Sequence, residues 1–172
     1  MSSPIELERV YDQHAQALFG YLLNLTRDEQ DTRDALQQVF VKLARQPDLL
    51  RQARDERAFL IRLAQNGAID LMRRRDARTR NHARFGAEHV PCSQFAPSTD
   101  PDEQGFRLEL ANALGELPVE QRAVVHLKLW EGLTFEEIAE ALEISANTAA
   151  SRYRYGLDKL RSLLRPLYEE IK

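Results

Sequence analysis

ERAFLIRLAQNGAIDLMRRR, residues 56–75, decides how the first half of this chain folds. Apolar residues recur there three or four positions apart, the spacing that lines one side of a helix; they are Phe59, Leu60, Leu63, Ala64, Gly67, Ala68, Leu71 and Met72. The other side carries Arg62, Asn66, Ile69, Asp70 and Arg73. Amides pair with base edges and Arg with bases or phosphates. The pattern therefore indicates either a nucleic-acid contact or a core helix with a solvated basic end.

Two further helices are predicted before this stretch. An apolar stripe runs from Ile5 to Leu25, and the TRDE segment at 26–29 is typical of a cap and turn. A second helix over residues 31–45 has one apolar and one polar face, and Pro47 ends it. Its polar face carries amides rather than dense charge, which suits a protein-facing surface and a solvated face about equally. Residues 47–55 are expected to be a short connection, and the three helices to form a small bundle.

Composition favours a globular, all-α protein. The 172 residues are 43% hydrophobic and 30% charged, with only seven Gly and seven Pro. No apolar run is long enough to cross a membrane and the N-terminus has no signal-peptide layout, so we expect a cytoplasmic protein without membrane insertion. Cys92 has no second Cys to pair with. With His89 it offers too few ligands for a zinc site, so no metal or cofactor is predicted.

Charge is distributed unevenly along the chain. Residues 47–84 hold ten Arg against five acidic residues, a balance of +5, whereas residues 85–121 hold one Arg against seven, a balance of −6. The whole chain has a net charge of −3. A freestanding binder of duplex DNA gains most of its affinity from surplus Lys and Arg, which release counterions. Any DNA binding by this chain is therefore expected to depend on a larger partner.

A long segment without periodicity separates the two halves. Residues 85–101 contain three Pro, and so long a loop is unusual within one compact domain. The fold class we predict is all-α, with two small helical domains joined by a flexible linker. The first is a three-to-four-helix bundle and the second a helix-turn-helix domain. The expected boundaries are 1–84, 85–101 for the linker and 102–172.

The second half contains the signals of a helix-turn-helix. Helices are expected over 102–117 and 119–130, the latter with Val124, Val125, Leu127, Leu129 and Trp130 as core candidates and Gly132 at its C-cap. Thr134 and Glu137 form a capping box for a helix over 135–142. A tight turn follows, and Ser145 caps the last helix. The second helix of such a pair can enter the major groove, although a generic helical hairpin is the alternative. Its outer face displays Asn147, Ser151, Arg154 and Asp158.

The two halves together resemble a known family. DALQQVF at 34–40, followed by FLIRLAQNGAIDLMRR at 59–74, is similar to sigma region two. LPVEQR at 117–122, EGLTFEEIA at 131–139 and SANTAASR at 145–152 are similar to sigma region four. The order and the gap match those of the extracytoplasmic-function (ECF) group of bacterial RNA polymerase sigma factors. The resemblance covers nearly the whole chain.

This resemblance implies an initiation subunit rather than an enzyme, with core RNA polymerase and promoter DNA as partners and an anti-sigma factor left open. The helix bearing the two Gln would dock on the polymerase largest subunit, with Asp34, Gln37, Gln38 and Lys42 as contacts. The central helix would bind unpaired bases of the minus-ten element, and with its preceding loop help to open the DNA. The last helix would lie in the minus-thirty-five major groove, and the acidic linker would pass through channels that later hold RNA. The implied DNA contacts are Arg62, Gln65, Asn66, Asp70, Arg73, Arg74, Asn147, Thr148, Ser151, Arg152 and Arg154.

Three positions depart from the family pattern. The family usually has Trp at Phe59, an acidic residue at Gln38 and Lys at Ala150. The last change removes one expected contact to DNA and affects the strength and sequence of upstream recognition. Two other function classes stay open: a standalone helix-turn-helix regulator, and a protein that binds polymerase as a decoy without starting transcription.

Overall fold

The computed structural model describes residues 4–79 and 100–171, and within these ranges the chain forms eight helices and no strand. The first four are α1 (Pro4–Thr26), α2 (Glu29–Arg45), α3 (Asp48–Gln52) and α4 (Glu56–Thr79). The others are α5 (Pro101–Gly115), α6 (Val119–Leu129), α7 (Phe135–Leu142) and α8 (Ala146–Ile171). This confirms the all-α prediction. The predicted linker falls almost wholly outside the described residues, as do His89 and Cys92.

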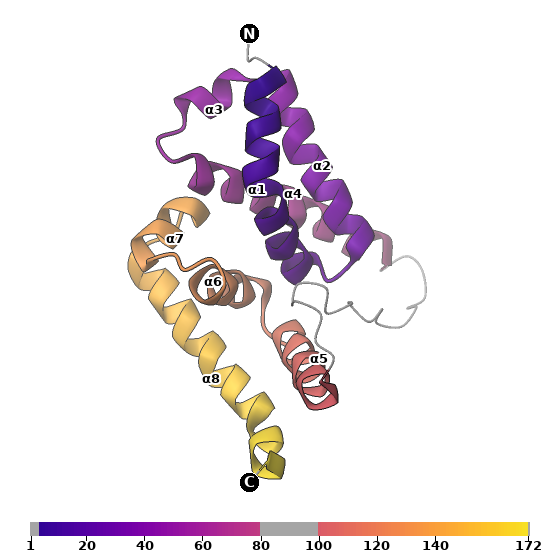
Figure 1. Ribbon diagram of the computed structural model, residues 1–172. Coiled ribbons are helices and arrows are strands. Elements are labelled where there is room, and N and C mark those ends of the chain that lie inside the picture. The colour runs from indigo at the N-terminus through magenta and orange to yellow at the C-terminus, as the bar shows by residue number, and fades with distance from the viewer. Residues whose placement is uncertain (1–3, 80–99, 172) are drawn as a thin grey trace.

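The first half is a bundle in which α4 packs against both α1 and α2 (Figure 1). Asp28 begins α2, because its carboxylate accepts a 2.8 Å hydrogen bond from the Asp31 amide. The connection after Pro47 is not a plain loop, as had been predicted, since residues 48–52 form α3. This helix buries none of its residues, so the sequence has no apolar periodicity there from which to predict it.

The second half arranges α5, α6 and α7 around α8. The predicted capping box is confirmed: Thr134 Oγ1 accepts from the Glu137 amide at 3.1 Å, and Glu137 Oε2 accepts from the Thr134 amide at 3.0 Å. Ser145 Oγ caps α8 by accepting from the Thr148 amide at 3.0 Å. α5 begins one residue earlier than predicted, because Asp100 is its N-cap and Pro101 occupies the first turn, where Pro is favoured.

Two predicted core residues are on the surface instead. Leu129 is 51% exposed and Trp130 is 38% exposed. α6 ends at Leu129, and the chain then turns through Gly132, whose φ of +66° favours glycine. Leu129 lies on the solvent side of the last turn of α6, and the Trp130 ring, at the C-cap, stacks on the His126 ring with centroids 5.4 Å apart.

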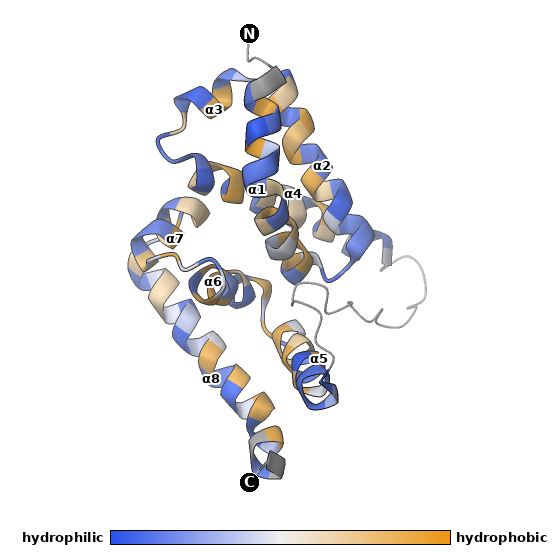
Figure 2. Ribbon diagram, viewed as in Figure 1, coloured by the Kyte–Doolittle hydropathy of each residue, from blue (hydrophilic) through white to orange (hydrophobic). Residues whose placement is uncertain are grey.

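One apolar cluster runs through both halves. It includes Leu22 of α1, Leu60 of α4, Leu127 of α6 and Ile138 of α7, all fully buried. α4 is therefore covered on two sides, by α1 and α2 on one and by α7 on the other (Figure 1). This explains why Ile61, outside the predicted stripe, is also buried. Figure 2 shows hydrophilic and apolar residues alternating around most of the helices.

The close approach of α8 to α6 depends on Gly156. A Cβ added there would lie 2.7 Å from Val125 Cγ2 and 3.1 Å from Leu117 Cδ2. Gly156→Ala should therefore lower the free energy of unfolding by about 1–3 kcal/mol through overpacking. Gly105→Ala is the matched control, because Gly105 is a helical residue with open space around it, and it should be neutral or slightly stabilising. Urea unfolding monitored by circular dichroism compares the two variants, and equal stability would contradict the packing account.

Candidate nucleic-acid and polymerase interfaces

The predicted minus-ten residues of α4 divide into two groups. Asn66, Asp70, Arg73 and Arg74 are exposed. Arg62 and Gln65 are half-buried and engaged within the protein. The Tyr21 hydroxyl donates a hydrogen bond to Gln65 Oε1, and burial raises the pKa of Tyr21, which keeps that donor protonated. Because Gln65 turns towards α1, it does not share the open face with Asn66.

Arg62 reaches across to the second half. Its Nη2 donates to the Glu140 carbonyl at 2.6 Å, and its Nε lies 3.5 Å from Glu143 Oε1. Both partners lie at the C-terminal end of α7, where helix carbonyls carry partial negative charge. In this conformation the Arg62 guanidinium, which is predicted to contact DNA, binds protein atoms instead.

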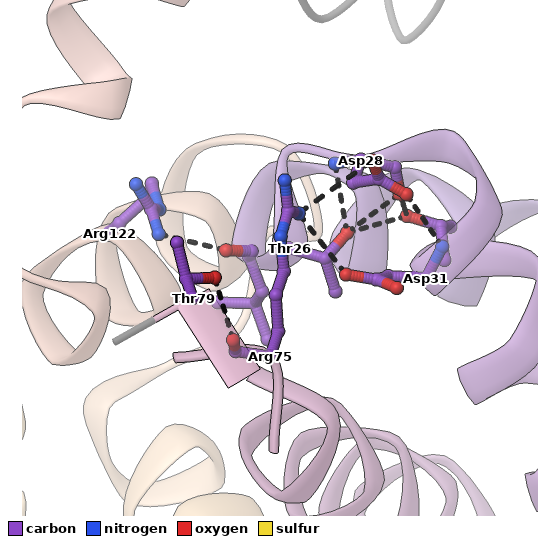
Figure 3. Close-up of polar contacts among 8 residues, drawn as sticks. Thr26, Asp28, Asp31, Arg75, Thr79 and Arg122 are labelled. Carbon is purple, nitrogen blue, oxygen red and sulfur yellow. Dashed lines mark hydrogen bonds and ion pairs between the residues drawn. The ribbon is translucent and has the colours of Figure 1, made fainter. Parts of the chain in front are cut away.

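The Arg residues at the end of α4 also fall into two groups, one that binds within the protein and one that is open to solvent; Figure 3 shows the first, Arg75. Arg75 Nη1 lies 3.2 Å from Asp31 Oδ2 and 3.6 Å from Asp28 Oδ2, so this side chain holds α4 to the start of α2. The pKa of Asp31 lies above its ordinary value, because burial and the neighbouring Asp28 raise it more than Arg75 lowers it. Phosphate contact is left to Arg73, Arg74 and the exposed Arg78.

A hollow of about 330 Å³ lies where the loop before α4 meets the start of α4. Residues of α3, of the loop after it, of α4 and of α7 line it: Leu49, Gln52, Ala53, Arg54, Asp55, Ala58, Phe59, Arg62 and Glu140. Phe59 provides an apolar surface of the kind on which unpaired bases stack, and the Arg side chains provide charge for phosphate. The sequence did not predict this hollow, because it depends on how α3 and the loop fold back beside α4.

α8 presents the predicted upstream contacts on its first turns. Asn147 and Arg154 are exposed, and Ser151 and Arg152 are half-buried. Thr148 has a second task, because its hydroxyl lies 2.8 Å from that of Ser145 in the helix cap. The Arg154 guanidinium lies 5.3 Å from the centroid of the Tyr155 ring. Tyr155, an exposed aromatic beside that Arg, was missed because its spacing places it off the Asn147–Ser151–Arg154 face.

The predicted polymerase contacts lie together on α2. Gln37, Gln38 and Lys42 are exposed, and Asp34 is half-buried and accepts from Gln30 Nε2 at 3.0 Å. Beside them, α1 and α2 form a groove of about 600 Å³ whose walls are mostly apolar. It is lined by Tyr11, Phe19, Arg33, Leu36, Gln37, Phe40, Val41 and Ala44. Tyr11, which falls within the apolar stripe predicted over residues 5–25, is 51% exposed and so lies outside the core.

The part of the chain that the structure describes contains neither a group of three or more His, Cys, Asp and Glu suited to a metal ion nor a helix able to span a membrane. The site is thus a set of exposed amide, Arg and apolar surfaces on helices. Surfaces of this kind bind macromolecules.

Comparison with known families agrees with the two-part reading of the chain. Residues 10–78 match the model of Sigma-70 region 2, and residues 107–160 match that of Sigma-70, region 4. The chain belongs to the ECF RNA polymerase sigma factors. It is a transcription initiation protein that directs RNA polymerase to promoters.

Individual relatives cover nearly the whole chain. ECF RNA polymerase sigma factor SigL of Mycobacterium tuberculosis (strain ATCC 25618 / H37Rv) is 33% identical over 165 residues, 94% of this chain and 90% of that protein. SigX of Bacillus subtilis (strain 168) is 27% identical over 165 residues, 94% and 85% of the two chains. The fold is similar to that of sigma factor RpoE from Bartonella quintana, solved in complex with the anti-sigma factor NepR. That match has a TM-score of 0.73 at 21% identity and covers 93% and 94% of the chains.

Proposed function

We propose that this sigma factor divides its work among three surfaces. Gln37, Gln38 and Lys42, with Asp34 and the neighbouring groove, bind core RNA polymerase. Asn66 and the α4 arginines bind unpaired minus-ten bases. The first turns of α8 read the minus-thirty-five element. The observation that carries the proposal is that all three surfaces project polar side chains that the apolar core does not use.

The groove beside Gln37 supports the polymerase assignment. An exposed apolar groove flanked by amides suits an amphipathic helix of a partner better than it suits DNA, which requires positive charge. Gln38 stands where the family usually has an acid, so docking here depends on apolar contact and hydrogen bonds more than on charge attraction.

The hollow before α4 supports the assignment of DNA opening. It combines an aromatic wall with Arg side chains and is reached from the surface. A base turned out of the duplex would stack against Phe59 while its phosphates met Arg54 or Arg62. Binding of the unpaired strand in this way stabilises the melted DNA.

We further propose the boundaries 1–84, 85–101 and 102–172 for the polymerase and minus-ten domain, the linker and the minus-thirty-five domain. The protein acts in the cytoplasm, has no catalytic activity of its own and uses no cofactor. An anti-sigma factor is a further proposed partner. The alternatives are a standalone regulator, which would bind duplex DNA without polymerase, and a decoy, which would bind polymerase without transcription.

Selection of promoters tests this division. Core polymerase with the chain is incubated with a random duplex library, and DNA in heparin-resistant complexes is sequenced. We expect two enriched motifs at a fixed spacing. Enrichment of an upstream motif by the chain without polymerase would favour the standalone regulator, and no enrichment beyond core polymerase would favour the decoy.

Asn66→Ala should lower the rate of open-complex formation on a selected promoter about tenfold, because an exposed amide that pairs with a base edge is lost. Permanganate footprinting of unpaired thymines measures the rate. A template already melted over the minus-ten element should recover part of the loss. An undiminished rate on duplex promoters would remove Asn66 from the DNA site.

Arg154→Ala should reduce promoter binding by about 1–3 kcal/mol if the guanidinium makes a bidentate contact with one base, and discrimination should relax at that position. With Ala150 in place of Lys, this Arg carries more of the upstream contact. Binding to promoter variants at each upstream position, at two salt concentrations, measures the effect. Uniform weakening with a shallower salt dependence would mean a phosphate contact. If a pre-melted template restores the function of Arg154→Ala as much as it restores that of Asn66→Ala, the two helices do not have separate tasks.

A further inference from the structure

The apolar stripe of α4 ends on a charged residue. Ala64 and Ala68 are fully buried, and Leu71 packs against the same apolar cluster. Four residues after Leu71, the same side of the helix carries Arg75. An Arg therefore stands where the core stripe would continue, on a helix that packs along α2.

Two carboxylates at the start of α2 receive this Arg. Arg75 Nη1 lies 3.2 Å from Asp31 Oδ2 and 3.6 Å from Asp28 Oδ2 (Figure 3). The side chains of Asp31 and Asp28 are only 22% and 15% exposed, so solvent weakens these ion pairs less than it weakens most surface pairs. Burial and Asp28 both raise the pKa of Asp31 and Arg75 opposes them, so the guanidinium offsets the repulsion between the two carboxylates. We call Arg75, Asp28 and Asp31 the α4 tie.

The two carboxylates are themselves held in place by short-range bonds. Asp28 is the N-cap of α2, and its side chain accepts from the Asp31 amide at 2.8 Å. The Thr32 hydroxyl donates to the Asp28 carbonyl at 2.7 Å, and the hydroxyls of Thr26 and Thr32, both buried, lie 2.7 Å apart. Because this network fixes the turn from α1 into α2, the carboxylates form a rigid acceptor for Arg75.

The end of α4 depends on this acceptor. Residues 73–79 are all exposed, so burial of apolar surface contributes little to holding this part of the helix. Asn66, Asp70 and Arg73 are exposed and follow one another at helical spacing, and we call them the outer row. Arg75 lies about 200° around the helix from Arg73, at roughly 100° per residue. The tie therefore holds the side of α4 opposite the outer row and resists rotation of the helix end about its axis.

We propose that Arg75 is a positioning residue, which with Asp28 and Asp31 fixes the rotation of the end of α4 and keeps the outer row facing the unpaired minus-ten bases. This inference rests on the proposed function for the role of the outer row. It gives the three Arg at 73–75 two tasks, because the first two contact phosphate and the third positions them. Since α2 also carries the proposed polymerase contacts, the tie sets the direction of the outer row relative to the bound polymerase.

Removal of the two carboxylates separates positioning from direct DNA contact, because the two roles predict different signs. Asp28→Asn/Asp31→Asn releases Arg75, and Asn is as good an N-cap as Asp. If Arg75 positions the outer row, core polymerase with this variant should form open complexes about fivefold more slowly. If Arg75 instead contacts phosphate, loss of two negative charges and release of the guanidinium should leave the rate unchanged or raise it, which would overturn the proposal.

Arg75→Gln should slow opening to a similar extent. Adding it to Asp28→Asn/Asp31→Asn should slow opening little further, because the three side chains act through one contact. Glu8→Gln/Glu109→Gln is the control for net charge, since it removes two acidic groups at exposed positions of α1 and α5, and it should open promoters at the parent's rate. Equal slowing by this control would mean that net charge, not the tie, sets the rate.

Exchange of the charges gives a rescue test. Arg75→Asp/Asp31→Arg restores opposite charges and should open promoters faster than Arg75→Asp alone. Asp31→Arg should not speed Arg74→Asp, the matched variant at the neighbouring exposed position. Permanganate footprinting measures all of these rates. An equal effect of Asp31→Arg on the two Asp variants would overturn the pairing of Arg75 with Asp31.

Hydrogen exchange of the free chain measures the tie without DNA or polymerase. Amides of residues 73–79 should exchange at least about threefold faster in Asp28→Asn/Asp31→Asn than in the charge control, because the helix end opens more readily. Circular dichroism checks folding, and Arg75→Gln, a change at an exposed residue, replaces the Asn variant if that variant is unfolded.

The two measurements separate the possible failures. Exchange equal to that of the control would overturn the tie. Faster exchange with an unchanged opening rate would overturn the positioning role when Asn66→Ala does slow opening. If Asn66→Ala does not slow opening, the proposed minus-ten face is wrong instead, and hydrogen exchange still decides whether the tie holds α4.

Discussion

Replacing both exposed amides of α2 in Gln37→Lys/Gln38→Lys should weaken binding to core RNA polymerase by about 2 kcal/mol, roughly thirtyfold. The two side chains lie at or beside the apolar groove, so two ammonium groups would have to be desolvated when a partner helix fills it. Neither amide is buried in the bundle, and thermal stability should stay nearly unchanged. Titration of labelled core polymerase measures the affinity.

The control for charge is Gln16→Lys/Asn112→Lys, at exposed positions of α1 and α5. This variant should bind core polymerase as the parent does. If both variants bind as tightly as the parent, the polymerase surface lies elsewhere. If both are equally weakened, net charge rather than the α2 surface determines affinity.

The largest loss of stability is expected at Arg122, which connects α6 to the end of α1. The side chain is buried, and its Nη2 donates to the Leu25 carbonyl at 2.8 Å (Figure 3). Burial lowers the pKa of Arg122 to about 10, so the guanidinium is still charged at neutral pH. Arg122→Ala should cost about 2–4 kcal/mol, because it leaves a cavity and a buried carbonyl without its donor.

Arg122→Met separates packing from hydrogen bonding, since it keeps most of the volume and removes the charge. We expect a smaller loss than for Ala, because both variants remove the charge and the donor, whereas Met leaves a smaller cavity. Urea unfolding followed by circular dichroism measures both variants. Equal losses would mean that the hydrogen bond matters more than the volume, and no loss in either would contradict the role of this side chain.

The sequence predicted local structure well where caps determine it. Thr134 and Glu137 fix the start of α7, and Ser145 that of α8, because the bonds they make lie within four residues. It missed α3, which has no buried face, and placed Trp130 in the core because periodicity does not reveal that α6 has already ended.

The candidate site was predictable only in part, for a physical reason. Exposure of Gln37 and Asn66 follows from helix periodicity. Arg62, by contrast, bonds to Glu140, 78 residues away, and Tyr21 meets Gln65 across 44 residues. Such contacts depend on how distant helices pack, and this packing cannot be predicted from a local sequence pattern. The hollow before α4 arises in the same way.

Run-off transcription tests the central claim most directly. Core RNA polymerase is incubated with the chain, a linear template carrying a selected promoter and nucleoside triphosphates, and the labelled transcript is measured. The account predicts a discrete transcript that requires both the chain and the promoter, and that is strongly reduced with Gln37→Lys/Gln38→Lys. A chain that binds core polymerase and promoter DNA yet yields no transcript above core polymerase without it would contradict the account.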